Sequence, residues 1–228
     1  MLAVLVPLLG YLIVDHYSKD VVPIPRLYVP ERVDTVVKDG KTSFDTVYHT
    51  IRNFKLTNQS GQQVSLEDLK GKVLLVDFFF TSCTSICPTL TSNLKKIQEA
   101  YVKNDTLLQI LSFTVDPVRD SAERLRQYAI KHNINTDTWW LLTGEKKEIY
   151  DIARNDFFVS VTQGDGGPDD FIHTEKLVLI DKNGHIRGYY NGLDNDAIRR
   201  CANDIAVLHL EKDRNRPPFW KRLFSGNE

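Results

Sequence analysis

The hydrophobic and polar positions of the chain predict buried strands that alternate with amphipathic helices. The densest apolar run covers Val73–Phe80, eight residues rich in Val, Leu and Phe, which suits a buried strand and is too short for a core helix. Similar runs cover 107–115 and, more briefly, 139–142. Residues 89–101 and 121–132 have the apolar spacing or the capping residues of helices. This alternation predicts an α/β domain built on a central sheet.

Turn-forming residues divide the rest of the chain into hairpins and one last helix. Asp39-Gly40 and Asn183-Gly184 are favoured turn pairs, and a further hairpin is predicted over 54–64. A capping residue, Asp194, begins a helix that runs to about residue 210 and places Cys201 on its apolar face. Cys201 is therefore expected to be a small core residue.

One segment before the last hairpin lacks apolar side chains that could pack in a core. Residues 163–170 are rich in Gly and Asp, and they follow an apolar run at 157–161. This composition predicts a mobile surface loop inserted into the domain. The loop leads directly to His173, which precedes a strand-like run at 175–181.

Two cysteines, Cys83 and Cys87, lie where the strand at 73–80 turns into the helix at 89–101. Pro88 follows at once, and proline suits the first turn of a helix, where its missing N–H has no partner in any case. A helix-like turn would hold the two Cα atoms roughly 6 Å apart on one face, within range for a disulfide or for two sulfurs on one metal ion. The helix N-terminus also favours thiolate, the form that attacks disulfides and binds metals. A pair of buried or simply bridged structural cysteines is the alternative interpretation.

Two cysteines need a further ligand to form a mononuclear metal site, and His173 stands out because of its place before a strand. The other five of the six histidines, which include His49, have no link to the cysteines and are expected at the surface. Asp116 lies in an Asp-Pro turn at the exit of the strand over 107–115, the edge where α/β sheets place ligands. By turn chemistry alone, an Asp at such a position is more often a turn-former or cap.

Three motifs of the chain resemble those of the SCO/SenC family. The motifs are Phe79-Phe80-Thr81-x-Cys83-x-x-x-Cys87-Pro88, then Thr114-Val115-Asp116-Pro117-x-x-Asp120, then His173-Thr174 ahead of Leu179-Ile180-Asp181. The resemblance covers about residues 50–210 and implies a thioredoxin-like protein that binds copper and helps to build the CuA centre of cytochrome c oxidase. It further implies that Cys83, Cys87 and His173 are the copper ligands. Asp116 would lie close to the site, where its carboxylate orients a ligand or takes up a proton.

The predicted order of elements agrees with that fold. We expect an α/β thioredoxin-like domain with a central mixed sheet flanked by helices, an extra N-terminal hairpin and an insertion before His173. The expected organisation is a membrane anchor or signal-like segment over 1–18, a linker over 19–50, the copper-binding domain over 51–211 and a tail over 212–228.

The ligand types favour copper as the cargo. Soft thiolates select Cu(I), and two sulfurs with one imidazole nitrogen make a three-coordinate site, with Cu(II) as a second form that depends more on His173. A structural zinc site would need a fourth ligand. The leading hypothesis is a metallochaperone that passes copper to cytochrome c oxidase subunit II or a similar acceptor. The alternative is a thiol-disulfide oxidoreductase that reduces partner cysteines with Cys83 and Cys87, and a peroxidase is a weaker third hypothesis.

Composition narrows the classes of partner. The chain has 228 residues, is 42% hydrophobic and has a formal net charge of −1, so one substantial core is expected and nothing recommends nucleic acid as a partner. Three cysteines are too few for a disulfide scaffold. The sequence contains no internal repeat, phosphate-binding Gly loop or Ser/His/Asp arrangement.

The N-terminal residues 1–14 contain no charged side chain. As a helix they would span about 21 Å, short of the roughly 30 Å hydrocarbon core, so we interpret them as a short or incomplete membrane anchor. An uncleaved signal peptide is the alternative. Because no Arg- and Ser-rich transit segment is evident, we expect a bacterial cell envelope, with an inner-membrane anchor and the domain on the periplasmic side. An upstream copper donor or a thiol reductant is a further expected partner.

Overall fold

The computed structural model describes residues 10, 25–26, 28–38, 41–101, 107–159 and 174–211. Several expectations fall outside these residues: the anchor over 1–18 apart from Gly10, the turn at Asp39-Gly40, the loop at 163–170, His173, and the tail over 212–228. Within the described ranges, no helix has the length and hydrophobicity needed to cross a membrane.

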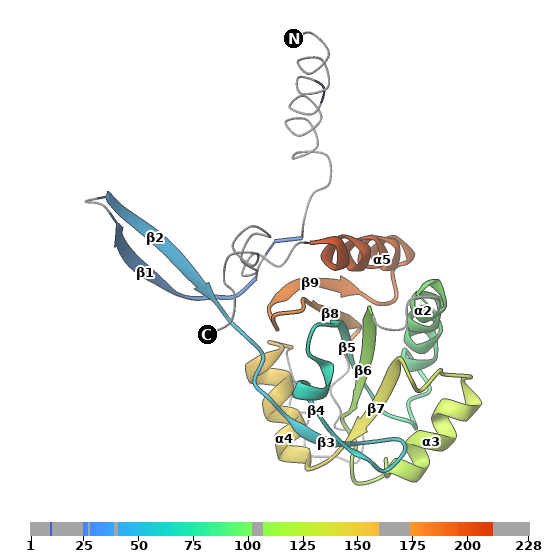
Figure 1. The fold of residues 1–228 in the computed structure, drawn as a ribbon. Helices are drawn as coiled ribbons and strands as arrows, with labels where there is room; N and C mark the ends of the chain where they lie inside the picture. Colours follow the sequence, from blue (N-terminus) through green and yellow to red (C-terminus); the bar gives the residue numbers. More distant parts are fainter. Residues whose placement is uncertain are drawn as a thin grey trace, which may run out of the picture.

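A mixed sheet forms the centre of the domain (Figure 1). Its strands, in order across the sheet, are β4 (Gln63–Ser65), β3 (Lys55–Asn58), β7 (Trp139–Thr143), β6 (Leu108–Thr114), β5 (Val73–Phe79), β8 (Lys176–Ile180) and β9 (Ile186–Asn191). The three middle strands β7, β6 and β5 are parallel, and the outer strands pair antiparallel. The predicted α/β fold with a central mixed sheet is confirmed.

Helices cover both faces of the sheet. The helical elements are η1 (Leu66–Leu69), α2 (Cys87–Ala100), α3 (Ala122–Lys131), α4 (Lys146–Asp151), η2 (Ile152–Asp156) and α5 (Asn195–Leu210). Their starts follow the sequence signals, since Ser121 Oγ accepts from Arg124 N at 3.3 Å and the Asp194 side chain accepts from Asp196 N at 2.9 Å. The helix after β7 changes type along its length, because α4 ends at Asp151 and the chain continues as the π-helical turn η2.

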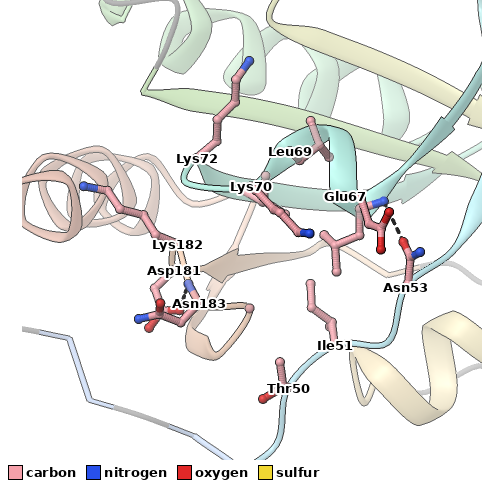
Figure 2. A pocket seen from close by; sticks show the side chains of 13 residues that line it. Thr50, Ile51, Asn53, Glu67, Leu69, Lys70, Lys72, Asp181, Lys182 and Asn183 are labelled. Atoms are coloured by element: carbon pink, nitrogen blue, oxygen red, sulfur yellow. Dashed lines mark hydrogen bonds between the residues drawn. The ribbon is translucent and has the colours of Figure 1, made fainter. Parts of the chain in front are cut away.

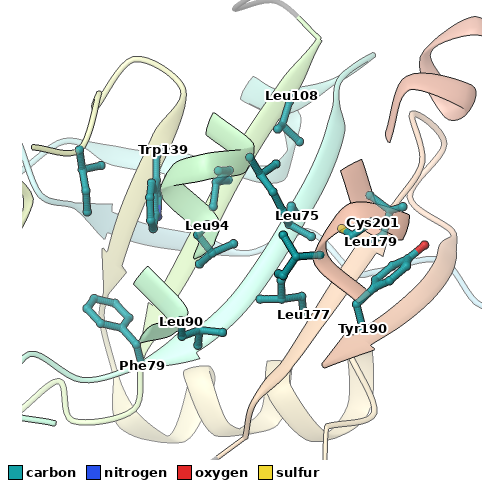
Figure 3. Close-up of a cluster of buried hydrophobic side chains, with 14 of the residues drawn as sticks. Leu75, Phe79, Leu90, Leu94, Leu108, Trp139, Leu177, Leu179, Tyr190 and Cys201 are labelled. Carbon is teal, nitrogen blue, oxygen red and sulfur yellow. The ribbon is translucent and has the colours of Figure 1, made fainter. Parts of the chain in front are cut away.

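The two faces of the sheet carry separate cores because successive strand residues point to opposite sides. Leu75 and Phe79 of β5 belong to the cluster beneath α2, α3 and α5, which Figure 3 shows around Leu94 and Cys201. Leu74 and Phe78 belong to the cluster beneath α4 and η2. Cys201 is fully buried, as expected of a core residue.

Adjacent tryptophans in β7 are divided in the same way. Trp139 is 1% exposed, whereas Trp140 is only half-buried. The alternation of side chains along β7 therefore places Trp139 in the core and leaves Trp140 at its margin.

An N-terminal hairpin stands off the domain in Figure 1 and is formed by β1 (Pro30–Lys38) and β2 (Lys41–Tyr48), which pair antiparallel. At its base, His49 N donates to Val29 O at 2.9 Å. His49 was expected at the surface, and that expectation is wrong: the residue is 8% exposed, with Nδ1 2.7 Å from Glu31 Oε1. The hairpin base folds against the domain and covers the ring, a long-range contact that local composition does not reveal.

Candidate metal centre

The turn between β5 and α2 brings Cys83 and Cys87 together. Cys87 is the first residue of α2 and Pro88 lies in its first turn, so the backbone N–H groups there lack helical partners. The N–H of Cys87 instead donates to Cys83 Sγ at 3.4 Å. Cys83 is partly exposed, whereas Cys87 is 3% exposed and both are free thiols. The structure therefore places an accessible sulfur at the N-terminus of a helix.

The two thiols differ in acidity. Burial tends to raise the pKa of Cys83, but hydrogen bonds from the side chain and backbone of Cys87 and from Ser85 outweigh it, so this pKa is lowered. Burial, followed by the hydrogen bond to Cys83, raises the pKa of Cys87 well above its usual range. Cys83 is thus the sulfur that more readily carries a negative charge, and Cys87 is the one that keeps its proton.

A third ligand for a metal ion does not come from the described part of the chain. Among those residues, no group of three His, Cys, Asp or Glu side chains could hold an ion. His173 lies outside the described residues, and the description resumes at Thr174, two residues before β8. Because β8 runs antiparallel to β5 with Val178 opposite Val76, its start lies at the edge of the sheet where β5 leads into the cysteine turn.

Asp116 lies on the loop after β6, close to the same edge. It is 5% exposed, and its carboxylate accepts a hydrogen bond from Arg119 Nε. The hydrogen bonds and ion pairs described for this side chain do not reach Cys83 or Cys87. Its expected role beside the thiols stays a prediction.

A buried carboxyl that the sequence reasoning missed lies in β5 itself. Asp77 is 2% exposed, on the side of the strand that faces α2 with Leu75 and Phe79. Burial raises the pKa of Asp77 to about 7, although a hydrogen bond from Ser112 acts in the opposite direction. The charge of Asp77 is one of the smaller causes that raise the pKa of Cys87. The available signal was a single carboxylate within an otherwise apolar strand.

A second missed carboxyl is Asp120, which belongs to the motif that begins at Thr114. It is fully buried and accepts hydrogen bonds from Thr81 and Thr114, so it joins the loop after β6 to the turn that carries the cysteines. The signal was present in the motif, but the sequence alone gave no reason to connect Asp120 with Thr81.

A pocket of about 370 Å³ lies at the end of the sheet where β5 begins, opposite the end that leads into the cysteines (Figure 2). It is lined by Lys72 and Leu74 at the start of β5, whereas the cysteines follow the end of that strand. Figure 2 shows Lys72 and Lys182 extending away from its centre, and their ammonium groups donate to Gln109 Oε1 at 3.1 Å and to His209 O at 2.8 Å. The pocket is therefore separate from the cysteine turn, and these lysines are engaged within the fold.

Comparisons with known proteins agree with this arrangement. The family model described as SCO1/SenC matches residues 44–208. A SCO1 protein homolog of Bacillus subtilis (strain 168) is 33% identical over 167 residues, which cover 73% of this chain and 86% of that protein. A protein of Stutzerimonas stutzeri that carries copper binding in its name is 28% identical over 159 residues, which cover 68% of this chain and 76% of that protein.

A solved structure has the same fold. BsSco, described as a member of the Sco family of cytochrome c oxidase assembly proteins and as having a disulfide switch, is 33% identical with a TM-score of 0.63. The match covers 72% of this chain and 95% of that chain. The expected thioredoxin-like fold is confirmed by this likeness.

Proposed function

The chain belongs to the SCO1/SenC family, and from this premise we propose that it is a copper metallochaperone of cytochrome c oxidase assembly. Copper is held by Cys83, Cys87 and His173 and is passed to the CuA site of oxidase subunit II or to a similar acceptor. The copper-binding name of the Stutzerimonas stutzeri relative and the oxidase-assembly description of BsSco support this proposal.

One observation carries the proposal: a partly exposed thiol of lowered pKa lies beside a second thiol at the start of α2. Thiolate is the form that binds metals, and soft thiolate ligands select Cu(I) over the harder divalent ions. Cys83 supplies the first such ligand at little cost in proton release. Cys87 must lose a proton that its surroundings retain, so copper binding releases this proton and competes with it.

His173 is the third ligand in this proposal. The described chain enters β8 at the edge of the sheet where β5 ends, which favours a ligand located just before Thr174. An imidazole nitrogen with two sulfurs completes a three-coordinate Cu(I) site, and a Cu(II) form would rely more on this nitrogen.

The cellular setting is part of the same proposal. The uncharged residues 1–14 tether the chain to the bacterial inner membrane, with the domain on the periplasmic side. An upstream donor supplies copper, and a thiol reductant keeps Cys83 and Cys87 in the form that binds it.

An anaerobic titration of the reduced full chain with Cu(I) against a competing chelator tests the proposal. We expect one copper per chain and a loss of at least about tenfold in affinity, or about 1.4 kcal/mol, in His173→Ala. His185→Ala is the matched control, because this histidine is half-buried on the turn between β8 and β9, beside Asp181 at 3.5 Å. Equal affinities in the native chain and His173→Ala would remove His173 from the site, and no binding by the native chain would overturn the proposal.

A second candidate, a thiol-disulfide oxidoreductase, is favoured by the unequal pair of cysteines. The Cys83 thiolate would attack a partner disulfide and form a mixed disulfide, with one partner sulfur leaving as thiolate. Cys87 would then give up its proton and displace the second partner sulfur. The partner gains two electrons. It receives one proton from Cys87 and one from solvent, which holds the proton that Cys83 released when it formed the thiolate, and Cys83 and Cys87 end as a disulfide. His173→Ala should leave this reaction unchanged, whereas it should weaken copper binding.

A further inference from the structure

Asp120 is a buried carboxylate whose hydrogen bonds all lead to the surroundings of the cysteine turn. It is 0% exposed, and it accepts from Thr81 N at 2.9 Å, from Thr81 Oγ at 2.5 Å and from Thr114 Oγ at 2.6 Å. A buried carboxylate is costly unless donors satisfy it, and here three do. The two Thr81 bonds fix both the backbone and the side chain of that residue.

Thr81 stands two residues before Cys83, at the first position after the apolar run of β5. The turn closes directly behind it, since Cys83 N donates to Phe80 O at 3.2 Å. Arg124 Nε adds a hydrogen bond to Thr81 Oγ at 3.1 Å from α3. The backbone of Cys83 is therefore held by a turn over residues 80–83, and Thr81 within this turn is hydrogen-bonded to Asp120.

Asp120 is itself held in place by hydrogen bonds with residues 114 and 116. Thr114 Oγ, which donates to Asp120, also accepts from Asp116 N at 3.1 Å, and Asp120 N donates to Asp116 O at 2.9 Å. Asp120 is thus fixed by the end of β6 and its loop, while its carboxylate reaches Thr81 in the turn that follows the neighbouring strand β5. A change at Asp120 would move the turn relative to the sheet.

We propose that Asp120 is a positioning residue for the cysteine pair, which keeps Cys83 Sγ at the start of α2 and so sets both the Cu(I) affinity and the stability of the reduced dithiol. The Cu(I) part of this inference rests on the proposed function. Because the sulfur of Cys83 accepts the N–H of Cys87 at 3.4 Å, a displaced turn lengthens this bond and moves the sulfur away from the start of α2. The reduced cysteine pair and the bound copper both depend on this position of the sulfur.

The test compares Asp120→Ala with a carboxylate of similar burial elsewhere. Asp156 is 1% exposed and accepts from Arg52 N at 3.0 Å and Arg52 Nε at 2.9 Å, in η2 on the other face of the sheet. Asp156→Asn therefore reports the effect of losing a buried carboxylate without touching the turn. Thr81→Ser is the conservative variant, because serine retains both the N–H and the hydroxyl that bind Asp120.

Two measurements on the full chain separate positioning from a structural role. The first equilibrates the Cys83–Cys87 disulfide with glutathione, in which two glutathione molecules give two electrons and two protons and leave as one oxidised glutathione. We expect Asp120→Ala to shift this equilibrium at least about tenfold towards the disulfide, which equals about 30 mV. The second measures Cu(I) affinity, which we expect to fall at least about tenfold, the range found when residues behind a metal ligand are changed.

Thr81→Ser and Asp156→Asn should both stay within about twofold of the native chain in these measurements, well below the effect expected of a residue behind a ligand. Equal values for Asp120→Ala, Asp156→Asn and the native chain would overturn the inference, whatever their melting temperatures. If Asp120→Ala fails to fold, Thr114→Val removes one donor at nearly the same volume and should shift the glutathione equilibrium in the same direction. If Thr114→Val has the same glutathione equilibrium as the native chain, the inference about Asp120 is also overturned.

The failure of this inference is distinguishable from the failure of the proposed function. If the native chain binds no copper, the proposed function fails while the glutathione equilibrium still decides the role of Asp120. If copper binds and neither measurement responds to Asp120→Ala, only the inference about Asp120 fails.

Discussion

The buried carboxyl of Asp77 predicts an unusual dependence of stability on pH. Asp77 is 2% exposed in β5, and its described partner is the hydroxyl of Ser112, which donates to it and in turn accepts from Trp139 Nε1 at 2.8 Å. This hydroxyl only partly offsets the cost of burial, so the pKa of Asp77 is raised from 3.8 to about 7. We consider the variant Asp77→Asn, which keeps the shape of the side chain and cannot ionise.

The sign of the effect follows from the protonated form being favoured in the folded chain. Below the unfolded pKa, Asp77 is neutral in both states and its burial is least costly. As the pH rises towards the folded pKa of about 7, the unfolded chain ionises freely and the folded chain does not, so stability is lost. Multiplying the difference between 3.8 and about 7 by 1.36 kcal/mol per pH unit gives a loss of about 4 kcal/mol by pH 8.

Urea unfolding of the full chain, followed by tryptophan fluorescence between about pH 4.5 and pH 8.5, measures this loss, because the linear extrapolation yields a free energy at each pH. We expect the free energy of unfolding of Asp77→Asn to gain on that of the native chain by about 3 kcal/mol across this range, because the carboxyl of the unfolded native chain is already mostly ionised at pH 4.5. Most of the gain falls below pH 7. Asp137→Asn, a change at an exposed carboxylate, should follow the native profile. Parallel profiles for Asp77→Asn and the native chain would refute the reasoning.

Three further predictions concern the cysteines and the core around them. Iodoacetamide at pH 7.5 should modify Cys83 at least about tenfold faster than Cys87, because only Cys83 combines exposure with a lowered pKa. Peptide mass spectrometry measures the two rates, and equal rates would contradict the difference in acidity between the two thiols. Leu94→Ala should lower the free energy of unfolding by about 2–5 kcal/mol in urea titrations, since Leu94 is 0% exposed on the face of α2 that packs against the sheet. Gly192→Ala should lower the melting temperature, because a Cβ there would overlap Leu90 Cδ1 and lie 3.0 Å from the backbone oxygen of Glu175. An unchanged melting temperature would show that Leu90 can move aside.

The elements of the fold could be predicted because their signals are local. The apolar run at 73–80 contains β5, and Ser121 and Asp194 cap the helices whose starts they predicted. The burial of His49 could not be predicted, since it depends on contacts of the ring with Glu31 at the base of the hairpin and with Phe158, which is distant in sequence. The π-helical end of the helix after β7 has no local signal that we recognise.

The site divides in the same way. The spacing of Cys83 and Cys87 at a junction of strand and helix was sufficient to predict that they meet, because two residues four positions apart in one turn cannot separate far. Their unequal acidity was not predictable from spacing, because it depends on burial and on which thiol donates to the other. The contact between Asp120 and Thr81 joins the segments that follow β6 and β5, and only the pairing of these two strands brings them together.

The asymmetry of the two thiols also determines which experiment can separate the candidate functions. Copper exchange with a partner and attack on a partner disulfide both begin at the accessible sulfur of Cys83. Replacing Cys83 therefore abolishes both activities and distinguishes nothing, and replacing Cys87 removes a ligand in one case and the resolving thiol in the other. An imidazole is required only for the metal. His173 is thus the position where the two hypotheses predict opposite outcomes, and copper affinity and disulfide turnover should be measured on the same preparation of His173→Ala.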